Sequence, residues 1–304
     1  MASQVSKPKT QRGKRFLLNR DAKLEENTKT VMLIRGGKTS EMVTQAMRDI
    51  HALKKPNATM FHRKNILRPF EDQSSLEFFS QRSDASLMVF GSHSKKRPHN
   101  LVFGCFYDFH MLDMFELGIE RYQPISEFKA HKVTVGTKPC LLFSGEEFEN
   151  KIEYRRLKSL FIDFWRGEKV ENIRLQGLEH ILQFTACEDK IYLRSYRVLL
   201  KKSGLKTPRV EVEEIGPSFN FALRRTRLAT ESLYKQSLRQ PKALKPRKVK
   251  NVEHDVFGTK TGRIHMQKQD LETLQTRKMK GLKRGKKSEE GDNQKKQKTD
   301  QDAE

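Results

Sequence analysis

The sequence predicts an α/β protein made of two similar halves, with a basic extension at each end. Strand-like apolar runs and helix-like periodic stretches follow one another in the same order twice between residues 30 and 234. Nearly all aromatic residues lie in this region, where a hydrophobic core needs them. The hydrophobic fraction of the whole chain is only 35%, below the roughly 45 to 50% of a globular domain. We therefore expect part of the chain to remain unfolded.

The first half begins with a strand, a glycine turn and a helix. A short apolar run predicts a strand at Val31–Ile34, and the turn Arg35-Gly36-Gly37-Lys38 follows it. Thr39 or Ser40 is expected to cap the helix, and Pro56 ends it. Apolar residues recur at helical spacing in this stretch, at Met42, Val43, Ala46, Met47, Ile50 and Leu53.

Two strands and a crossing helix are predicted to complete the first half. The strands are Leu87–Phe90 and Leu101–Phe106, and the loop GSHSKKRPHN joins them. Between Asp108 and Glu120, the segment MLDMFELGIE is predicted to form a helix that crosses to the second half.

The second half repeats this order. A strand at Cys140–Phe143 leads through a turn at Gly145 into a helix at Ile152–Arg166, which Gly167 closes. Further strands are expected at His180–Ala186 and Lys190–Leu200, joined as a hairpin around Glu188-Asp189, and at Arg209–Glu213. The repeated order of elements, and not sequence identity between the halves, indicates a duplicated α/β unit.

The stretch Glu214–Leu228, EIGPSFNFALRRTRL, closes the second half. Its Gly-Pro pair breaks one strand, and alternating apolar and polar residues then predict a second strand with one buried face. This strand ends in Arg224, Arg225 and Arg227. Guanidinium groups match phosphate oxygens in geometry. These arginines are therefore candidate phosphate contacts, although a core strand followed by a solvated basic face is the alternative.

This stretch resembles the closing signature of the Brix family of ribosome-assembly proteins. Many family members carry a basic residue at the position of Ser218, so no RNA contact is assigned there. The resemblance implies two tandem α/β halves, each similar to the anticodon-binding domain of certain aminoacyl-tRNA synthetases. It spans residues 30–234, with halves at about 30–125 and 126–234. The segments TVMLIRGGKTSEMV, HKVTVGTKPCLLFSGEEFE and RRTRLATESLYK point to one branch of the family.

Basic extensions flank this predicted domain. Residues 1–29 form an arm without regular periodicity, and residues 235–304 form a tail that we expect to be largely extended or disordered. The chain contains 61 Lys and Arg against 38 Asp and Glu, a formal net charge of +23. A charge of this size indicates polyanionic partners and says nothing about the fold.

Basic residues gather at four places that are candidate RNA-binding sites. The turn at Gly36-Gly37-Lys38-Thr39 is not a phosphate loop, because Met32 stands where that motif needs glycine. This turn is either a purely structural turn or a contact to the RNA backbone. The loop between the first-half strands is either a phosphate contact or simply solvated. The tail clusters serve RNA binding, nuclear import or solubility. The candidate RNA-binding residues are Arg35, Lys38, Lys95, Lys96, Arg97, Arg224, Arg225, Arg227, Lys245, Arg247 and Lys248.

Catalytic, metal and membrane sites find no support in the sequence. It has no H-E-x-x-H or G-x-S-x-G motif, and we expect no cofactor and no metal. Cys105, Cys140 and Cys187 are far apart and are expected to be reduced core residues. No apolar run approaches the roughly 20 residues of a membrane span, so we expect a soluble, intracellular protein without membrane contact.

The Brix resemblance implies a non-enzymatic ribosome assembly factor in the nucleus and nucleolus. It implies binding to 5S rRNA and pre-rRNA, with the regulator of ribosome synthesis as heterodimer partner and the two ribosomal proteins of the 5S particle as further partners. The implied role is to bring the 5S particle into the pre-60S large ribosomal subunit and to support maturation of its rRNA. The alternatives are an RNA-modifying or nucleotide-hydrolysing enzyme, or a general basic nucleic-acid binder.

Overall fold

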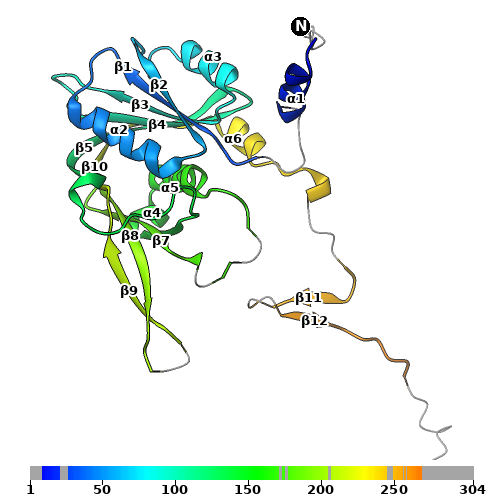
Figure 1. Cartoon of the computed structure of the whole chain (residues 1–304). Helices are drawn as coiled ribbons and strands as arrows, with labels where there is room; N and C mark the ends of the chain where they lie inside the picture. The colour runs from blue at the N-terminus through cyan, green and yellow to red at the C-terminus, as the bar shows by residue number, and fades with distance from the viewer. Residues whose placement is uncertain are drawn as a thin grey trace, which may run out of the picture. The chain divides into compact units, whose positions relative to one another are not determined.

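The structure is a computed structural model and describes residues 9–20, 27–170, 173–174, 177–204, 207–244, 249–255, 257 and 259–268. The chain divides into two compact units, Met1–Leu244 and Lys245–Glu304. The first unit contains a ten-stranded sheet with helices on its faces, which is an α/β fold (Figure 1). No helix in the described ranges is long and apolar enough to cross a membrane.

The first half of the sheet and its helices follow a short N-terminal helix, α1 (Gln11–Arg20). The elements of this half are β1 (Val31–Gly36), α2 (Glu41–Lys54), β2 (Ala58–Asn65), α3 (Ser74–Ser83), β3 (Leu87–Ser92), β4 (Asn100–Tyr107) and β5 (His110–Gln123). A 3-10 helix, η1 (Ile125–Glu127), leads to the second half.

The second half contains β6 (Cys140–Ser144), α4 (Glu147–Asn150), α5 (Ile152–Trp165), β7 (His180–Cys187), β8 (Lys190–Lys201), β9 (Arg209–Glu214) and β10 (Ser218–Arg227). The first unit ends with α6 (Glu231–Ser237) and η3 (Lys242–Leu244). In the second unit, β11 (Val252–His254) and β12 (Lys260–Gly262) form a hairpin.

The two halves repeat one strand order about the centre of the sheet. The order is β2-β1-β3-β4-β5-β10-β8-β7-β6, with β9 attached to β8. β1 and β3 are parallel, as are β6 and β7, and the strands that follow them are antiparallel in both halves. Each half also has a two-residue hairpin with positive φ, at Asp108-Phe109 and at Glu188-Asp189. The predicted duplication of an α/β unit is therefore confirmed.

Two hydrophobic clusters fill opposite faces of the sheet. The larger cluster packs α2 and α5 against one face and runs through both halves, from Val31 and Val43 to Phe161 and Phe221. The smaller cluster lies on the opposite face of the first half, where α3 contributes Leu76. Strands β1, β3, β4 and β5 are therefore buried on both sides, and this accounts for their nearly continuous apolar runs.

Local sequence signals account for several of these elements. Ser40 caps α2, and its Oγ accepts from the amide of Val43 at 3.3 Å, as the sequence predicts. Gly216 has φ +68°, and a Cβ atom at this position would overlap the Phe128 ring. Only glycine fits that backbone conformation and that space, and Gly216 lies in the break between β9, which ends at Glu214, and β10, which begins at Ser218.

One predicted element is wrong, and others were missed. The segment MLDMFELGIE is not a helix but lies within β5. Both faces of β5 are buried, so it lacks the alternation that marks a half-exposed strand. The sequence reading also missed β2, whose residues ATMFHRKN are mostly polar, and α3, and the predicted arm contains α1.

A buried histidine makes the stability of the second half depend on pH. His180 on β7 is 5% exposed, and its Nε2 lies 2.9 Å from Ser195 Oγ on β8. Burial lowers the pKa of His180 to about 4. Between pH 6.5 and 4 the folded state thus binds fewer protons than the unfolded state. The contribution of His180 to the free energy of unfolding is therefore fully present above pH 6.5 and is lost as the pH falls.

We expect the variant His180→Gln to lose less unfolding free energy than the wild type between pH 6.5 and 4. The slopes of unfolding free energy against pH should differ between the two proteins by up to about 1.4 kcal/mol per pH unit, because the variant has no imidazole to protonate. Urea unfolding at half-unit pH steps measures both curves. Parallel curves would show that His180 titrates normally in the folded protein.

Candidate nucleic-acid interface

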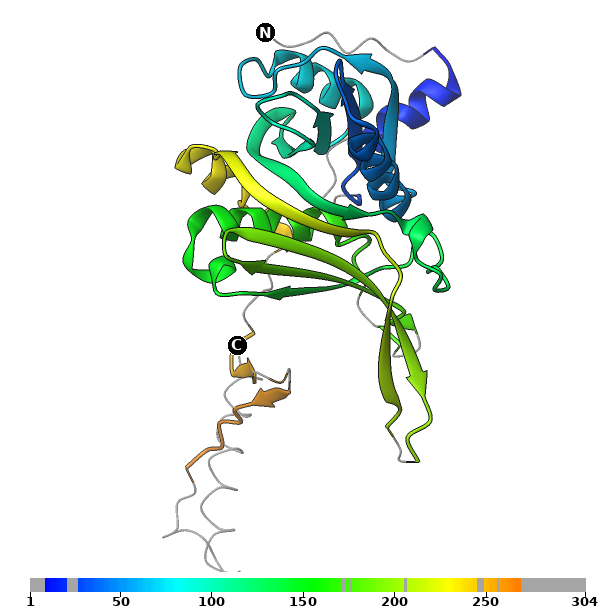
Figure 2. The same ribbon diagram turned by 90° about the vertical axis from the view of Figure 1, so that its left-hand side faces the viewer.

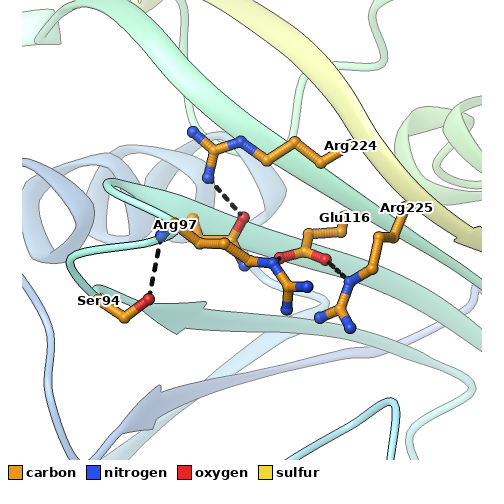
Figure 3. A network of polar contacts seen from close by, with 6 residues as sticks. Ser94, Arg97, Glu116, Arg224 and Arg225 are labelled. Atoms are coloured by element: carbon orange, nitrogen blue, oxygen red, sulfur yellow. Dashed lines mark hydrogen bonds and ion pairs between the residues drawn. The ribbon is translucent and has the colours of Figure 1, made fainter.

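A β-bulge places two neighbouring arginines on the same face of the sheet. Arg225 on β10 pairs with Glu116 on β5, and the register shifts between Leu223 and Arg225, which leaves Arg224 as an extra residue. Side chains normally alternate between the faces of a strand, and a bulge redirects one of them. Arg224 consequently reaches Asn100. Figure 3 shows Arg225 reaching Glu116, with Arg224 on the same face.

A fully buried carboxylate organises these arginines. Glu116 has 0% side-chain exposure, and its Oε2 accepts a hydrogen bond from Arg225 Nε. Its Oε1 accepts from Asn100 Nδ2 at 2.8 Å and lies 3.5 Å from Arg97 Nε. Arg224 Nη1 donates to Asn100 Oδ1 at 3.2 Å. We call these five residues the Glu116 cluster; three guanidinium groups and one carboxylate give it a formal charge of +2.

Neighbouring residues fix the orientation of the two β10 arginines. A Cβ atom at Gly118 on β5 would overlap the Arg224 guanidinium, so glycine leaves the space in which that group lies. The Arg225 guanidinium carbon lies 4.1 Å from the centre of the Phe70 ring, a cation–π contact. Arg225 keeps 39% of its side-chain surface exposed and Arg97 keeps 43%. Both therefore have N–H groups available for an external anion.

Two basic loops adjoin each other beside this cluster. In the β3–β4 loop, the amide of His93 donates to the carbonyl of Lys38 in the β1–α2 turn at 2.8 Å. His99 Nδ1 lies 2.9 Å from the Oγ of Ser40. Burial lowers the pKa of His99, and the charges of His93 and Arg224 lower it further. The two contacts, from His93 and from His99, hold the loop against the start of α2.

The adjoining loops expose most of their cations. Lys38, Lys95 and Lys96 are all exposed. The structure thus brings Lys38, Lys95 and Lys96 into two adjacent loops, and Arg97 continues from the second loop into the Glu116 cluster. The N–H groups of such lysine and arginine side chains can donate hydrogen bonds to the oxygens of a phosphodiester backbone.

Two further candidates contact residues outside the Glu116 cluster. Arg35 Nη2 donates to the carbonyl of His62 on β2, and its Nε is buried without a hydrogen-bond partner among the described residues. Arg227 Nε lies 3.2 Å from the Gln73 amide when that amide presents its oxygen. The tail candidates Lys245, Arg247 and Lys248 lie outside the described residues.

The residues that hold the arginines were missed in the sequence. Glu116, Asn100 and Gly118 lie on β4 and β5, and β5 was predicted to be a helix. One signal was present, because Glu116 is a lone carboxylate in the apolar run MFELGI. A buried carboxylate needs a positive partner, so this residue should have indicated a nearby arginine. In the described ranges, no group of three His, Cys, Asp or Glu side chains is arranged to hold a metal, and the three cysteines are free thiols.

Comparison with known proteins identifies the class. A family model described as the Brix domain matches residues 36–225, which span the sheet from the end of β1 almost to the end of β10. Among solved structures, the crystal structure of a probable ribosomal biogenesis protein from Aeropyrum pernix K1 aligns with a TM-score of 0.42 at 9% identity, covering 66% of this chain and 99% of that chain.

Curated relatives narrow the class to one branch. Ribosome production factor 2 homologs from Bos taurus and Homo sapiens are each 59% identical, over 85% of this chain and 85% and 84% of their own lengths. Ribosome biogenesis protein RPF2 from Saccharomyces cerevisiae is 42% identical over 91% of this chain and 84% of its own. The chain belongs to the Brix-domain family, in the branch of the ribosome production factor 2 homologs.

Replacing Arg225 with methionine should destabilise the fold, because Glu116 would remain buried with one guanidinium fewer. Since Arg225 is 39% exposed, we expect a loss of about 1 to 3 kcal/mol of unfolding free energy, measured by urea unfolding. Arg63→Met, at an exposed arginine on β2, is the control and should change stability little.

The double variant Arg225→Met/Glu116→Gln should recover part of this loss. A buried amide needs no counter-charge, whereas a buried carboxylate does. A double variant less stable than the single variant would show that Arg225 does not compensate the charge of Glu116.

Proposed function

We propose that the protein is a non-enzymatic ribosome assembly factor that binds 5S rRNA and pre-rRNA through the Glu116 cluster and the adjoining basic loops. In this proposal it acts in the nucleolus, with the regulator of ribosome synthesis as heterodimer partner and together with the two ribosomal proteins of the 5S particle. It helps to bring that particle into the pre-60S subunit and supports rRNA maturation. The names of its relatives, ribosome production and ribosome biogenesis factors, support this role.

The geometry of the Glu116 cluster carries the RNA-binding part of the proposal. A flexible surface arginine loses side-chain entropy when it binds a phosphate, whereas Arg224 and Arg225 are already held by Asn100, Glu116 and Phe70. Their formal charge exceeds that of the single carboxylate between them. With Lys95 and Lys96 exposed in the adjoining loop, the surface can release counterions from an RNA backbone.

The protein-binding part of the proposal rests on a helix of the first half that has no counterpart among the described residues of the second half. In the first half, α3 covers the sheet face that carries Met32, Ile34 and Met88. On the equivalent face of the second half, Leu142 is 45% exposed and Ile181 is partly exposed. Tyr192, Arg194 and Tyr196 lie on the same face by their register.

No helix in the described residues packs on this second-half face, since α4 and α5 contribute to the cluster on the other side. We propose that the heterodimer partner places an amphipathic helix there, in the position that α3 has in the first half. We also propose the domain limits as residues 1–29 for the arm, 30–234 for the Brix domain and 235–304 for the tail.

Neutralising cations at the proposed RNA surface should weaken 5S rRNA binding and its salt dependence. The variant Lys95→Gln/Lys96→Gln/Arg224→Gln leaves the Arg225–Glu116 pair intact. We expect at least tenfold weaker binding, because three phosphate contacts are lost. The slope of log affinity against log salt should fall by about 2 to 3, at roughly 0.7 to 0.9 for each contact. Filter binding or fluorescence anisotropy from 50 to 300 mM salt gives both values.

The matched control removes the same charge elsewhere, in Lys129→Gln/Lys132→Gln/Lys202→Gln, at three exposed lysines. It should retain most of the affinity and slope. Equal losses in both variants would indicate nonspecific attraction, and tRNA that competes as well as 5S rRNA would favour a general nucleic-acid binder. Turnover of ATP, or a mass change in bound RNA, would favour an enzyme.

Acidic substitutions on the second-half face should disrupt the proposed heterodimer. Leu142→Asp/Ile181→Asp places two carboxylates where an apolar helix would pack, so co-purification with the regulator of ribosome synthesis should fall at least tenfold. Val135→Asp/Ile152→Asp is the control, because both of these residues are exposed elsewhere, by 66% and 61%. If the control lost the partner equally, or the first variant kept it while folded, this location would be wrong.

A further inference from the structure

The guanidinium group of Arg225 is held on one edge and on one face. Arg225 lies on β10, the strand that runs between the two halves of the sheet (Figure 2). Its Nε donates to Oε2 of the buried Glu116, which occupies that edge. Its guanidinium carbon lies over the Phe70 ring, 4.1 Å from the ring centre, so the ring covers one face. Because 39% of the side chain is still exposed, the second face and the Nη edge are the parts of the group left open to a ligand.

Phe70 gives this guanidinium a rigid backing. Phe70 lies in the turn between β2 and α3, where the amides of Glu71 and Asp72 donate to the carbonyl of Arg68 at 2.9 and 3.0 Å. Its ring packs against the smaller hydrophobic cluster. A ring held by the core holds in turn the plane of the guanidinium above it. A second flat group can therefore stack on Arg225 with little further loss of side-chain entropy.

Arg97 presents similar groups beside Arg225. It approaches the other oxygen of Glu116 through its own Nε, at 3.5 Å, and keeps 43% of its side chain exposed. Figure 3 shows the two guanidinium groups at the Glu116 carboxylate. Both arginines use Nε for Glu116, and their Nη atoms have no hydrogen-bond partner among the described residues and are not buried. These Nη atoms can donate to a phosphate.

The open face of Arg225 indicates which part of an RNA molecule fits this site. A phosphate would use only the Nη edge and would leave that face uncovered. In RNA recognition, bases stack on arginine guanidinium planes as well as on aromatic rings. Within a duplex, each base is already stacked between its neighbours, so sequence-specific recognition uses nucleotides that are unpaired. The site therefore fits an unpaired nucleotide better than it fits a continuous duplex.

We propose that the Arg225 guanidinium, backed by Phe70, stacks on the base of an unpaired nucleotide in the bound RNA, while Arg97 holds a neighbouring phosphate. Phe70 is a positioning residue, since it acts through Arg225. This inference rests on the proposed function, because it names the RNA feature that the Glu116 cluster recognises. Every base has a face that can stack, so we expect little preference between bases.

The test uses the full-length protein and three labelled RNA duplexes of one sequence. The first duplex is fully paired, and the second carries one bulged adenosine. The third carries an abasic nucleotide at the bulge, which keeps the backbone and removes the base. Fluorescence anisotropy gives each affinity. We expect the adenosine bulge to bind at least about fivefold more tightly than the other two, which is the low end of what stacking of one base contributes.

Two substitutions separate stacking from charge. Arg225→Lys keeps a positive charge for Glu116 but has no planar group, and it should lower the preference for the adenosine bulge to about twofold or less. Phe70→Leu should lower this preference in part, because the guanidinium keeps its bond to Glu116 but loses the ring that fixes its plane. Both variants should bind the fully paired duplex as the wild type does. Arg63→Lys, at an exposed arginine on β2, is the matched control and should keep the full preference.

The fluorescence of 2-aminopurine at the bulge gives a second measurement. Its emission falls when the base stacks, so it should be quenched by the wild type and much less by Arg225→Lys. The variant Lys95→Gln/Lys96→Gln/Arg224→Gln should bind all three duplexes more weakly and keep the preference, because Arg225, Arg97 and Phe70 are intact. Urea unfolding checks that each variant is folded, and the comparison of adenosine with abasic bulges needs no variant.

Three results would overturn the proposal. Equal affinity for the adenosine and abasic bulges would show that only the backbone is recognised. A full preference in Arg225→Lys would show that the planar group is not used. A guanosine bulge bound at least tenfold more tightly than the adenosine bulge would show that arginine reads a base edge. RNA binding without any preference for the bulge would contradict this inference alone, whereas no binding to any of the duplexes would contradict the proposed function as well.

Discussion

The antiparallel ladder between β5 and β10 joins the two halves of the Brix domain along nine registered residue pairs. Each half ends its strand order at this ladder, so neither half closes its own sheet. The ladder also carries the bulge that turns Arg224 and Arg225 to one face, opposite the strand that supplies Glu116. The proposed RNA surface therefore exists only when both halves are folded and paired. A register slip of one residue would move the arginines away from their carboxylate.

Two buried carboxylates on β5 fix chain segments on opposite faces of the sheet. Glu116 holds arginines on the side of α3. Asp113 is 4% exposed and accepts from the amide of Ala229 at 2.8 Å and from Arg156 on α5 at 3.3 Å. The Arg156 guanidinium carbon in turn lies 3.3 Å from the centre of the Tyr234 ring on α6. A buried charge needs a partner of opposite charge. Each of these carboxylates therefore holds a basic side chain in a fixed position.

Elements with clear local signals could be predicted from the sequence. The capped helix α2, the striped helix α5, and the alternating strands β7 and β10 were all recognised. Prediction failed where tertiary contacts decide the conformation. β5 is buried on both faces, and β2 is a mostly polar edge strand without apolar alternation. The arginines of the candidate site could be found by their charge, and Glu116 had one signal, as a lone carboxylate in an apolar run. Asn100 could not be found, because its role depends on pairing across the sheet.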